Sequence, residues 1–316
     1  MRLRVIPLGT SAGKPTLQRG ASALAIAADS GWTMCDCGEG AQLAAMRAGL
    51  SLSRLDAVLI THLHGDHFNG LPGLLGSLGL DGRQRPLLVA GPKGIAATLE
   101  LLGRVGALGL GHLPVTVREL EGEGGALAWE HGFEDWQLSA LPLTHRAPTY
   151  GYRVALPDRP GALDVLAADR AGVPRGPLLA QLKAGRSIRL PDGRELGPEG
   201  LVGPALRGPS VAYTLDTVPC AEAVALGRGV DLLVHEATYE HARAPLARER
   251  GHSSGVEAAE IARAAGARRL LLTHFSPSVQ AEQVADEARA IFAETVAAAD
   301  GKELSVAAPA LAVDLG

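Results

Sequence analysis

Short apolar runs recur along the chain and predict strands that alternate with helices. Runs of this length, bounded by Gly, Pro or polar residues, are typical of buried strands. The predicted strands are residues 3–8, 22–28, 32–35, 57–60, 87–90, 115–120, 136–143, 152–156, 211–215, 231–234 and 270–273. The predicted helices are residues 41–47, 71–80, 95–105, 219–226 and 254–265, the last with a capping box at its start. This alternation indicates an α/β fold.

Four of the predicted strands end in a side chain of a type that binds metals. The runs at residues 57–60, 136–143, 211–215 and 270–273 lead into His62, His145, Asp216 and His274. In open α/β folds, side chains at the carboxyl ends of strands gather into one site. The sequence therefore predicts that these four side chains meet.

The densest group of such side chains is residues 61–67, which read Thr-His-Leu-His-Gly-Asp-His. Side chains alternate along extended backbone, so His62 and His64 point the same way, and after the turn at Gly65 two further ligands face a second position. A lone histidine usually belongs to a polar turn, but burying this many ligands without a cation would be costly. We expect two metals, one on His62, His64 and His145, the other on Asp66, His67 and His274, with Asp216 bridging them.

These motifs resemble the metallo-β-lactamase superfamily, and more narrowly the ribonuclease Z family of tRNA 3′-processing endonucleases. The resembling residues are spread over nearly the whole length of the chain: 8–16, 36–42, 61–67, 70–75, 145, 151–153, 216–217, 235–238, 251–253 and 273–276. The cluster at 61–67 is common to the whole superfamily, whereas residues 36–40 and 235–238 are more specific to ribonuclease Z. The resemblance implies a four-layer αβ/βα metallo-β-lactamase sandwich of two similar halves, with an inserted projecting arm, and a homodimer.

The resemblance also implies an activity. It is a zinc-dependent endoribonuclease that removes 3′ trailers from precursor tRNA, using a hydroxide held between two zinc ions and leaving a 3′-hydroxyl on the tRNA. His and Asp ligands equally suit manganese or iron. The alternatives are a general phosphodiesterase of the same fold acting on another RNA or small phosphodiesters, and a metal-bearing but inactive scaffold. The presence of all seven ligands argues against the scaffold.

Asp66 has a second expected role at this site, and three further residues, His252, Glu236 and Asp36, are expected to support the chemistry. The family assigns the proton-acceptor role to Asp66. The leaving 3′ product still needs a proton, for which His252 is the candidate, with Glu236 holding its second ring nitrogen. A buried structural His–Glu pair is the alternative for these two. In the family an aspartate matching Asp36 supports the metal loop, although a helix N-cap is equally compatible with the sequence.

Between residues 157 and 204 the alternation of strands and helices breaks down. Residues 170–194 carry six Arg or Lys against one acidic residue, a net charge of +5 in a chain of net charge −4. A long irregular insertion is usually functional or disordered, and a plain solvated insertion is the alternative. By position and by residues 172–177, it resembles the arm with which ribonuclease Z grips tRNA. The expected phosphate-binding residues are Arg170, Arg175, Lys183, Arg186 and Arg189, on an arm at 157–204 between core segments 1–156 and 205–316.

Whole-chain composition narrows the class of protein. A net charge of −4 excludes a uniformly basic nucleic-acid-binding protein, so RNA contact needs a local basic patch. The three cysteines fit reduced thiols in a cytosolic protein. The chain shows no signal peptide and no apolar stretch of membrane-spanning length. We therefore expect a cytoplasmic protein.

Overall fold

The computed structural model describes residues 2–29, 31–109, 113–122, 129–133 and 136–308. The chain forms two compact units, the larger comprising residues 1–155 and 209–307 and the smaller residues 156–208. In the described part of the chain, no helix combines the length and the apolar character needed to cross a membrane. Cys35, Cys37 and Cys220 are free thiols, as expected.

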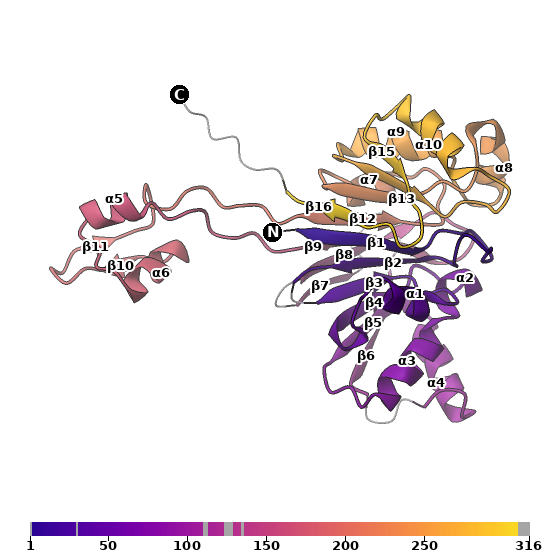
Figure 1. Ribbon diagram of the computed structural model, residues 1–316, viewed down its shortest axis with the longest axis horizontal. Helices are drawn as coiled ribbons and strands as arrows, with labels where there is room; N and C mark the ends of the chain where they lie inside the picture. Colours follow the sequence, from indigo (N-terminus) through magenta and orange to yellow (C-terminus); the bar gives the residue numbers. More distant parts are fainter. Residues whose placement is uncertain (1, 30, 110–112, 123–128, 134–135, 309–316) are drawn as a thin grey trace. The chain divides into compact units, whose positions relative to one another are not determined.

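Two seven-stranded sheets form the centre of the larger unit (Figure 1). The first sheet has the order β16 (Leu304–Val306), β1 (Leu3–Gly9), β2 (Ala23–Ala27), β3 (Trp32–Cys35), β4 (Leu55–Leu59), β5 (Leu87–Pro92) and β6 (Val115–Leu120). The second has the order β15 (Thr295–Ala297), β14 (Leu270–Thr273), β13 (Leu232–Glu236), β12 (Ser210–Thr214), β9 (Thr149–Ala155), β8 (Trp136–Leu143) and β7 (Trp129–Phe133).

Helices cover the outer face of each sheet, which gives the four layers (Figure 1). The helices of the first half are α1 (Ala41–Arg47), α2 (Gly65–Phe68), α3 (Leu71–Leu80) and α4 (Ile95–Arg104), with the 3₁₀ turn η1 (Leu52–Arg54). Those of the second half are α7 (Ala221–Leu226), α8 (Ala244–Glu249), α9 (Gly255–Ala265) and α10 (Ala281–Arg289), with η2 (His241–Arg243). The predicted αβ/βα sandwich of two similar halves is confirmed.

The hydrophobic pattern explains how the helices attach. In α3, four leucines at spacing i, i+3, i+4 and i+7 are buried in the core of the first half: Leu71, Leu74, Leu75 and Leu78. Strands β4, β12, β13 and β14 are buried at every residue, as expected for strands covered on both faces. In the second sheet β12, β13 and β14 run parallel, so their carboxyl ends reach the same edge.

Large polar side chains join the two halves. The Tyr152 hydroxyl, from the second sheet, donates to the Ile60 carbonyl at 2.6 Å, and the Trp136 indole donates to Asp56 at 2.9 Å. These aromatic residues are almost fully buried, so each brings apolar area and one satisfied polar group to the interface. The two sheets are thereby held in a fixed relation around the edge where the ligands lie.

The smaller unit is not irregular, so this part of the sequence interpretation was wrong. It contains α5 (Val165–Arg170), α6 (Pro177–Lys183), and a hairpin of β10 (Ile188–Arg189) and β11 (Glu195–Leu196). The Asp164 side chain caps α5 by accepting from Ala167 N at 2.8 Å. The unit has its own small core: Ala168, Val173, Leu182, Ile188, Leu190 and Leu201. It spans residues 156–208, slightly beyond the expected insertion.

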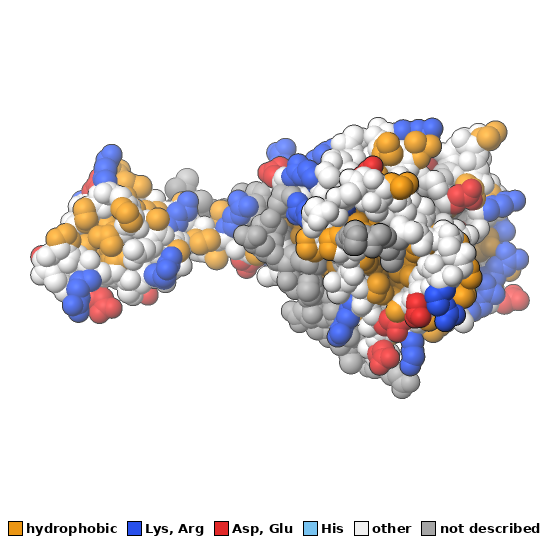
Figure 2. All heavy atoms as spheres, turned by 90° about the horizontal axis from the view of Figure 1, so that it is seen from below, with side chains coloured by type: hydrophobic (Ala, Val, Ile, Leu, Met, Phe, Trp, Pro, Cys, Tyr) orange, Lys and Arg blue, Asp and Glu red, His pale blue; other side chains and the backbone are white. Residues whose placement is uncertain are grey.

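The smaller unit as a whole carries a more mixed charge than residues 170–194 alone suggested. Residues 156–208 include eight Lys or Arg and six Asp or Glu, a net charge of +2. On the face seen in Figure 2, basic side chains of this unit are interspersed with apolar ones. The five residues predicted to bind phosphate are all exposed.

Candidate metal centre

The seven predicted ligands all follow carboxyl ends of strands, and the structure brings them together. The loop and short helix after β4 carry His62, His64, Asp66 and His67, while β8, β12 and β14 lead to His145, Asp216 and His274. Their donor atoms form two groups, within each of which all atoms lie within 4.8 Å of one another, and a third such group, Asp216, Glu236, His252 and His274, shares one residue with each of them. The convergence follows from the shared edge of the strands.

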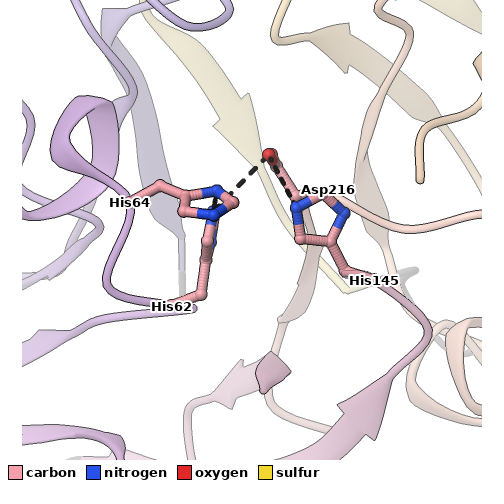
Figure 3. A group of neighbouring side chains, drawn as sticks. All are labelled: His62, His64, His145 and Asp216. Atoms are coloured by element: carbon pink, nitrogen blue, oxygen red, sulfur yellow. Dashed lines mark hydrogen bonds and ion pairs between the residues drawn. The ribbon is translucent and has the colours of Figure 1, made fainter. Parts of the chain in front are cut away.

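The first group is His62, His64, His145 and Asp216 (Figure 3). His62 Nε2 lies 2.8 Å from His64 Nδ1 and 3.6 Å from Asp216 Oδ2. His145 Nε2 lies 3.9 Å from the same carboxylate oxygen. These donors come from both halves of the larger unit and face a common point.

The second group is Asp66, His67 and His274. The Nε2 atoms of His67 and His274 are 3.3 Å apart, and they lie 3.3 and 3.5 Å from Asp66 Oδ2. Asp216 Oδ1 is 3.3 Å from His67 Nε2 and 3.2 Å from His274 Nε2. The two oxygens of Asp216 therefore face the two groups separately.

Four of the histidines have their other ring nitrogen held by the protein. The Nδ1 contacts are His62 to Thr61 Oγ1 at 3.0 Å, His67 to Asp36 Oδ2 at 2.7 Å, His145 to Gly251 O at 2.8 Å and His274 to Thr238 Oγ1 at 3.1 Å. A histidine whose Nδ1–H donates in this way presents an unprotonated Nε2, which is the usual arrangement of metal-binding histidines.

The donor set fits a cation. Within the described residues, the buried His145 Nε2 and Asp216 Oδ1 have no hydrogen-bond partner, a costly state unless an ion satisfies them. Burial lowers the pKa of His62 to about 2. Burial alone would raise the pKa of Asp66, but hydrogen bonds from His274 and His67 lower it. Burial alone would lower the pKa of His67, but the carboxylates of Asp216 and Asp36 raise it above its usual value, so this histidine must lose a proton when a metal binds. Neutral imidazole and ionised carboxylate are the forms that bind metals.

Asp36 supports the second group from a fully buried position. Its carboxylate accepts from Thr61 N at 2.7 Å, Thr61 Oγ1 at 2.9 Å, His67 Nδ1 at 2.7 Å and the Tyr213 hydroxyl at 3.0 Å. The alternative, that Asp36 is a helix N-cap, is wrong. The N-cap residue of α1 is Gly40, and no described side chain caps this helix. Tyr213 belongs to the second sheet, so sequence spacing gave no signal of this contact.

Backbone conformation marks the same site. Asp36, Asp216 and His274 have φ values of 56°, 50° and 59°, a left-handed region that few residues other than glycine adopt. Each follows the last residue of a strand directly or closely. Strained backbone tends to occur at functional sites, where the surrounding structure holds it.

Glu236 and His252 lie beside the cluster as a hydrogen-bonded pair. The buried Glu236 carboxylate accepts from Thr217 N at 2.8 Å, Ser253 N at 3.0 Å, Thr238 Oγ1 at 2.6 Å and His252 Nδ1 at 2.9 Å. Burial alone would lower the pKa of His252, but the Glu236 carboxylate outweighs it and raises this pKa to about 9. His252 keeps 13% of its side chain exposed and lines the same cavity as Asp66 and His145.

Replacing Gly251 with alanine is expected to disturb His145. Gly251 has φ +80°, and an added Cβ would lie 2.7 Å from His145 Nδ1, so the loop or the imidazole must move. Because such supporting contacts tune metal sites, we expect metal affinity to fall by about 10- to 100-fold. Competition with a chromophoric chelator measures it. Gly229→Ala is the control, because Gly229 also has positive φ (+60°) but open space around it. Equal affinities in the two variants would contradict the role given to this contact.

Comparisons with known proteins agree with this geometry. Residues 17–88 match the model of the metallo-beta-lactamase superfamily, and residues 180–275 match a beta-lactamase superfamily domain. Ribonuclease Z of Synechococcus sp. (strain WH7803) is 43% identical over 314 residues, which cover 96% of each chain. Ribonuclease BN of Cronobacter sakazakii (strain ATCC BAA-894) is 42% identical over 95% of this chain and 98% of its own. The crystal structure of human tRNase Z, short form, aligns with a TM-score of 0.69 and 26% identity, covering 96% of this chain and 100% of that chain.

Proposed function

The chain belongs to the ribonuclease Z family of the metallo-β-lactamase superfamily, and we propose that it is a metal-dependent endoribonuclease that removes 3′ trailers from precursor tRNA. The observation that carries the proposal is the convergence of seven His and Asp donors at one edge of the two sheets. The match to ribonuclease Z proteins over nearly the whole chain supports the choice of tRNA as substrate.

We propose two zinc ions, one held by His62, His64 and His145, the other by Asp66, His67 and His274, with Asp216 shared. Manganese or iron would suit the same donors. When bound, two such cations lower the pKa of a water and neutralise charge on the phosphate. The grouping of donor atoms around the two oxygens of Asp216 supports this assignment.

Removing the metals is expected to destabilise the protein markedly. The apo state leaves buried donors unsatisfied, and saturating ligand at about 1,000 times its Kd stabilises a protein by about 4 kcal/mol. For a chain of this size that corresponds to a fall in Tm of about 10 °C. Differential scanning calorimetry before and after chelation, and after zinc is restored, measures this. An unchanged Tm after complete removal of metal would contradict the proposed centre.

Side chains of the protein accept and donate the protons that the reaction transfers. Asp66 accepts a bond from Gly13 N at 2.7 Å, which fixes its carboxylate at the cavity wall to accept the proton of the attacking water. As that water forms a P–O bond, the bond from phosphorus to the leaving 3′ oxygen breaks. His252, held through Nδ1 by Glu236, gives its Nε2 proton to that oxygen. The products are a tRNA 3′-hydroxyl and a trailer 5′-phosphate.

We propose that the smaller unit binds the tRNA body through Arg170, Arg175, Lys183, Arg186 and Arg189. Arg175 also lies 3.6 Å from Asp169, and Arg194 lies 2.8 Å from Asp192. Contacts to phosphates give affinity without reading sequence, which suits an enzyme that processes many tRNAs.

Removing Arg186 and Arg189 together is expected to weaken binding of precursor tRNA at moderate salt. Each lost phosphate contact should reduce the slope of log K against log salt by about 1. Filter binding across a salt series measures this. Arg194→Ala is the matched control, because the Arg194 charge is already paired with Asp192. If the control lowers the slope as much as the double variant, the assignment of these residues is wrong.

The homodimer and the cytoplasmic location remain predictions. Light scattering coupled to size-exclusion chromatography at micromolar concentration would give the mass of the assembly. A mass of one chain, 32.6 kDa, would contradict the predicted homodimer.

The test of the proposed function uses purified protein with zinc or manganese. The substrates are a 3′-extended precursor tRNA and bis-p-nitrophenyl phosphate, a small diester. A single cut between acceptor stem and trailer supports the proposal. Hydrolysis of the small diester without cleavage of the RNA would leave a general phosphodiesterase and overturn the tRNA assignment.

A further inference from the structure

The cavity over the metal centre is lined by basic side chains. These side chains take no part in the proposed proton transfers. The cavity has a volume of about 410 Å³, and its walls include Asp66, His145 and His252 together with Lys14, Arg146 and Arg250. Each of these cations is exposed, while its backbone belongs to a loop that carries or contacts a residue of the site. Their backbones therefore lie at the rim of the cavity, and their exposed side chains are within reach of a ligand that enters it.

Arg146 and Arg250 lie on one side of the cavity, that of His145 and His252. Arg146 directly follows His145, whose ring centroid is 5.3 Å from that of His252. Arg250 precedes Gly251, the residue whose carbonyl accepts from His145 Nδ1 at 2.8 Å. Lys14 is placed differently, next to Gly13, whose N–H binds Asp66 at 2.7 Å. Arg146 and Arg250 thus lie on the side of His252, the proposed proton donor, and Lys14 lies on the side of Asp66, the proposed proton acceptor.

The two arginines are also available for an anion. Among the described carboxylates, none forms an ion pair with Arg146 or Arg250, whereas nearby Arg248 pairs with Glu257 at 2.6 Å. Arg250 Nη1 instead donates to the Tyr239 hydroxyl at 2.9 Å, a neutral partner that orients the guanidinium without cancelling its charge. Guanidinium groups bind phosphate through two parallel hydrogen bonds, so they suit a backbone phosphate well.

We infer that Arg146 and Arg250 bind the phosphate immediately 5′ of the one that is cut, and so set which phosphodiester enters the metal centre. The inference rests on the proposed function, because His252 marks the side of the leaving 3′ oxygen and hence of the tRNA body. The strand 5′ of the cut leaves the cavity on this side, past the two arginines. Without this contact a flexible single strand could slide by one nucleotide.

The test combines protein variants with a precursor tRNA assembled by ligation. One version carries a neutral methylphosphonate at the linkage immediately 5′ of the cut. The variants are Arg146→Ala, Arg250→Ala and, as the control that removes one charge from the other side of the cavity, Lys14→Ala. The measured quantities are kcat/KM and the position of the cut, with bis-p-nitrophenyl phosphate as a substrate that has no flanking phosphate.

Each arginine variant is expected to lose about tenfold to a hundredfold in kcat/KM on the unmodified RNA, the scale of one charged hydrogen bond. It should keep its activity on the small diester within about twofold. The methylphosphonate should cost the wild type at least a similar factor, and it should cost each arginine variant clearly less than the wild type, because each variant has already lost one of the two contacts to that phosphate. Lys14→Ala should remain as sensitive to the methylphosphonate as the wild type.

Two results would overturn the inference. One is a methylphosphonate effect in the arginine variants that equals the wild-type effect. The other is an equal loss on RNA and on the small diester, which would indicate a structural role. If the wild type cuts no RNA at all, the proposed function itself fails, and this outcome is distinct because it needs no variant.

Discussion

Asp216→Asn is expected to lose at least about 10³-fold in kcat/KM on both precursor tRNA and bis-p-nitrophenyl phosphate. The Asp216 carboxylate faces both donor groups, with Oδ1 3.2 Å from His274 Nε2 and Oδ2 3.6 Å from His62 Nε2. Asparagine keeps the shape but removes the charge, and its amide cannot bridge two cations. Plasma emission spectrometry of the dialysed protein should therefore show fewer metal ions per chain.

Asp231→Asn provides the matched control for this variant. Asp231 is also buried and belongs to the same half of the sandwich as Asp216. Its contacts are structural: it accepts from Ser210 N at 2.9 Å and pairs with Arg268 at 3.3 Å. We expect it to lower Tm while retaining the metals. A fully metal-loaded and active Asp216→Asn protein would contradict the bridging role.

His252→Ala is expected to reduce kcat on precursor tRNA by about 10²- to 10⁴-fold, the usual contribution of a general acid. On bis-p-nitrophenyl phosphate the loss should be much smaller, because nitrophenolate leaves without a proton. The ratio of the two losses is the informative quantity. It separates proton donation from a structural part played with Glu236, to which His252 Nδ1 is bonded at 2.9 Å.

A structural role for His252 predicts a different outcome. Loss of the imidazole would then disturb the Glu236 network and impair both substrates to the same degree. Metal content and Tm, measured on the same preparation, show whether the site remains assembled. Equal losses on the two substrates would remove His252 from the mechanism.

The candidate metal ligands and their grouping could be predicted from the sequence because their signal is local. Residues 61–67 place four ligands within one short stretch, and the others directly follow apolar runs that form buried strands. The fold class followed from the same alternation and from the family resemblance. The ligand cluster and the fold class both depend on patterns between residues close together in the sequence, or on motifs that are recognisable without the structure.

What the sequence could not supply depends on contacts between distant segments. The bond from Tyr213 to Asp36 crosses from one sheet to the other. The rim arginines line one cavity because the loop after β8 contacts the loop before α9 through His145 and Gly251. The smaller unit was misjudged for another reason. Its helices have six and seven residues, too short for a clear helical period, and its stability depends on a small core.

The most direct test of the central claim is to identify the ends left on a 3′-extended precursor tRNA by the wild type and by Asp66→Ala. The account predicts one metal-dependent cut, a 3′-hydroxyl on the tRNA, a 5′-phosphate on the trailer, and no product from Asp66→Ala. A 2′,3′-cyclic phosphate, or cleavage that persists in Asp66→Ala or without metal, would contradict it, because the chemistry would then not take place at this cluster.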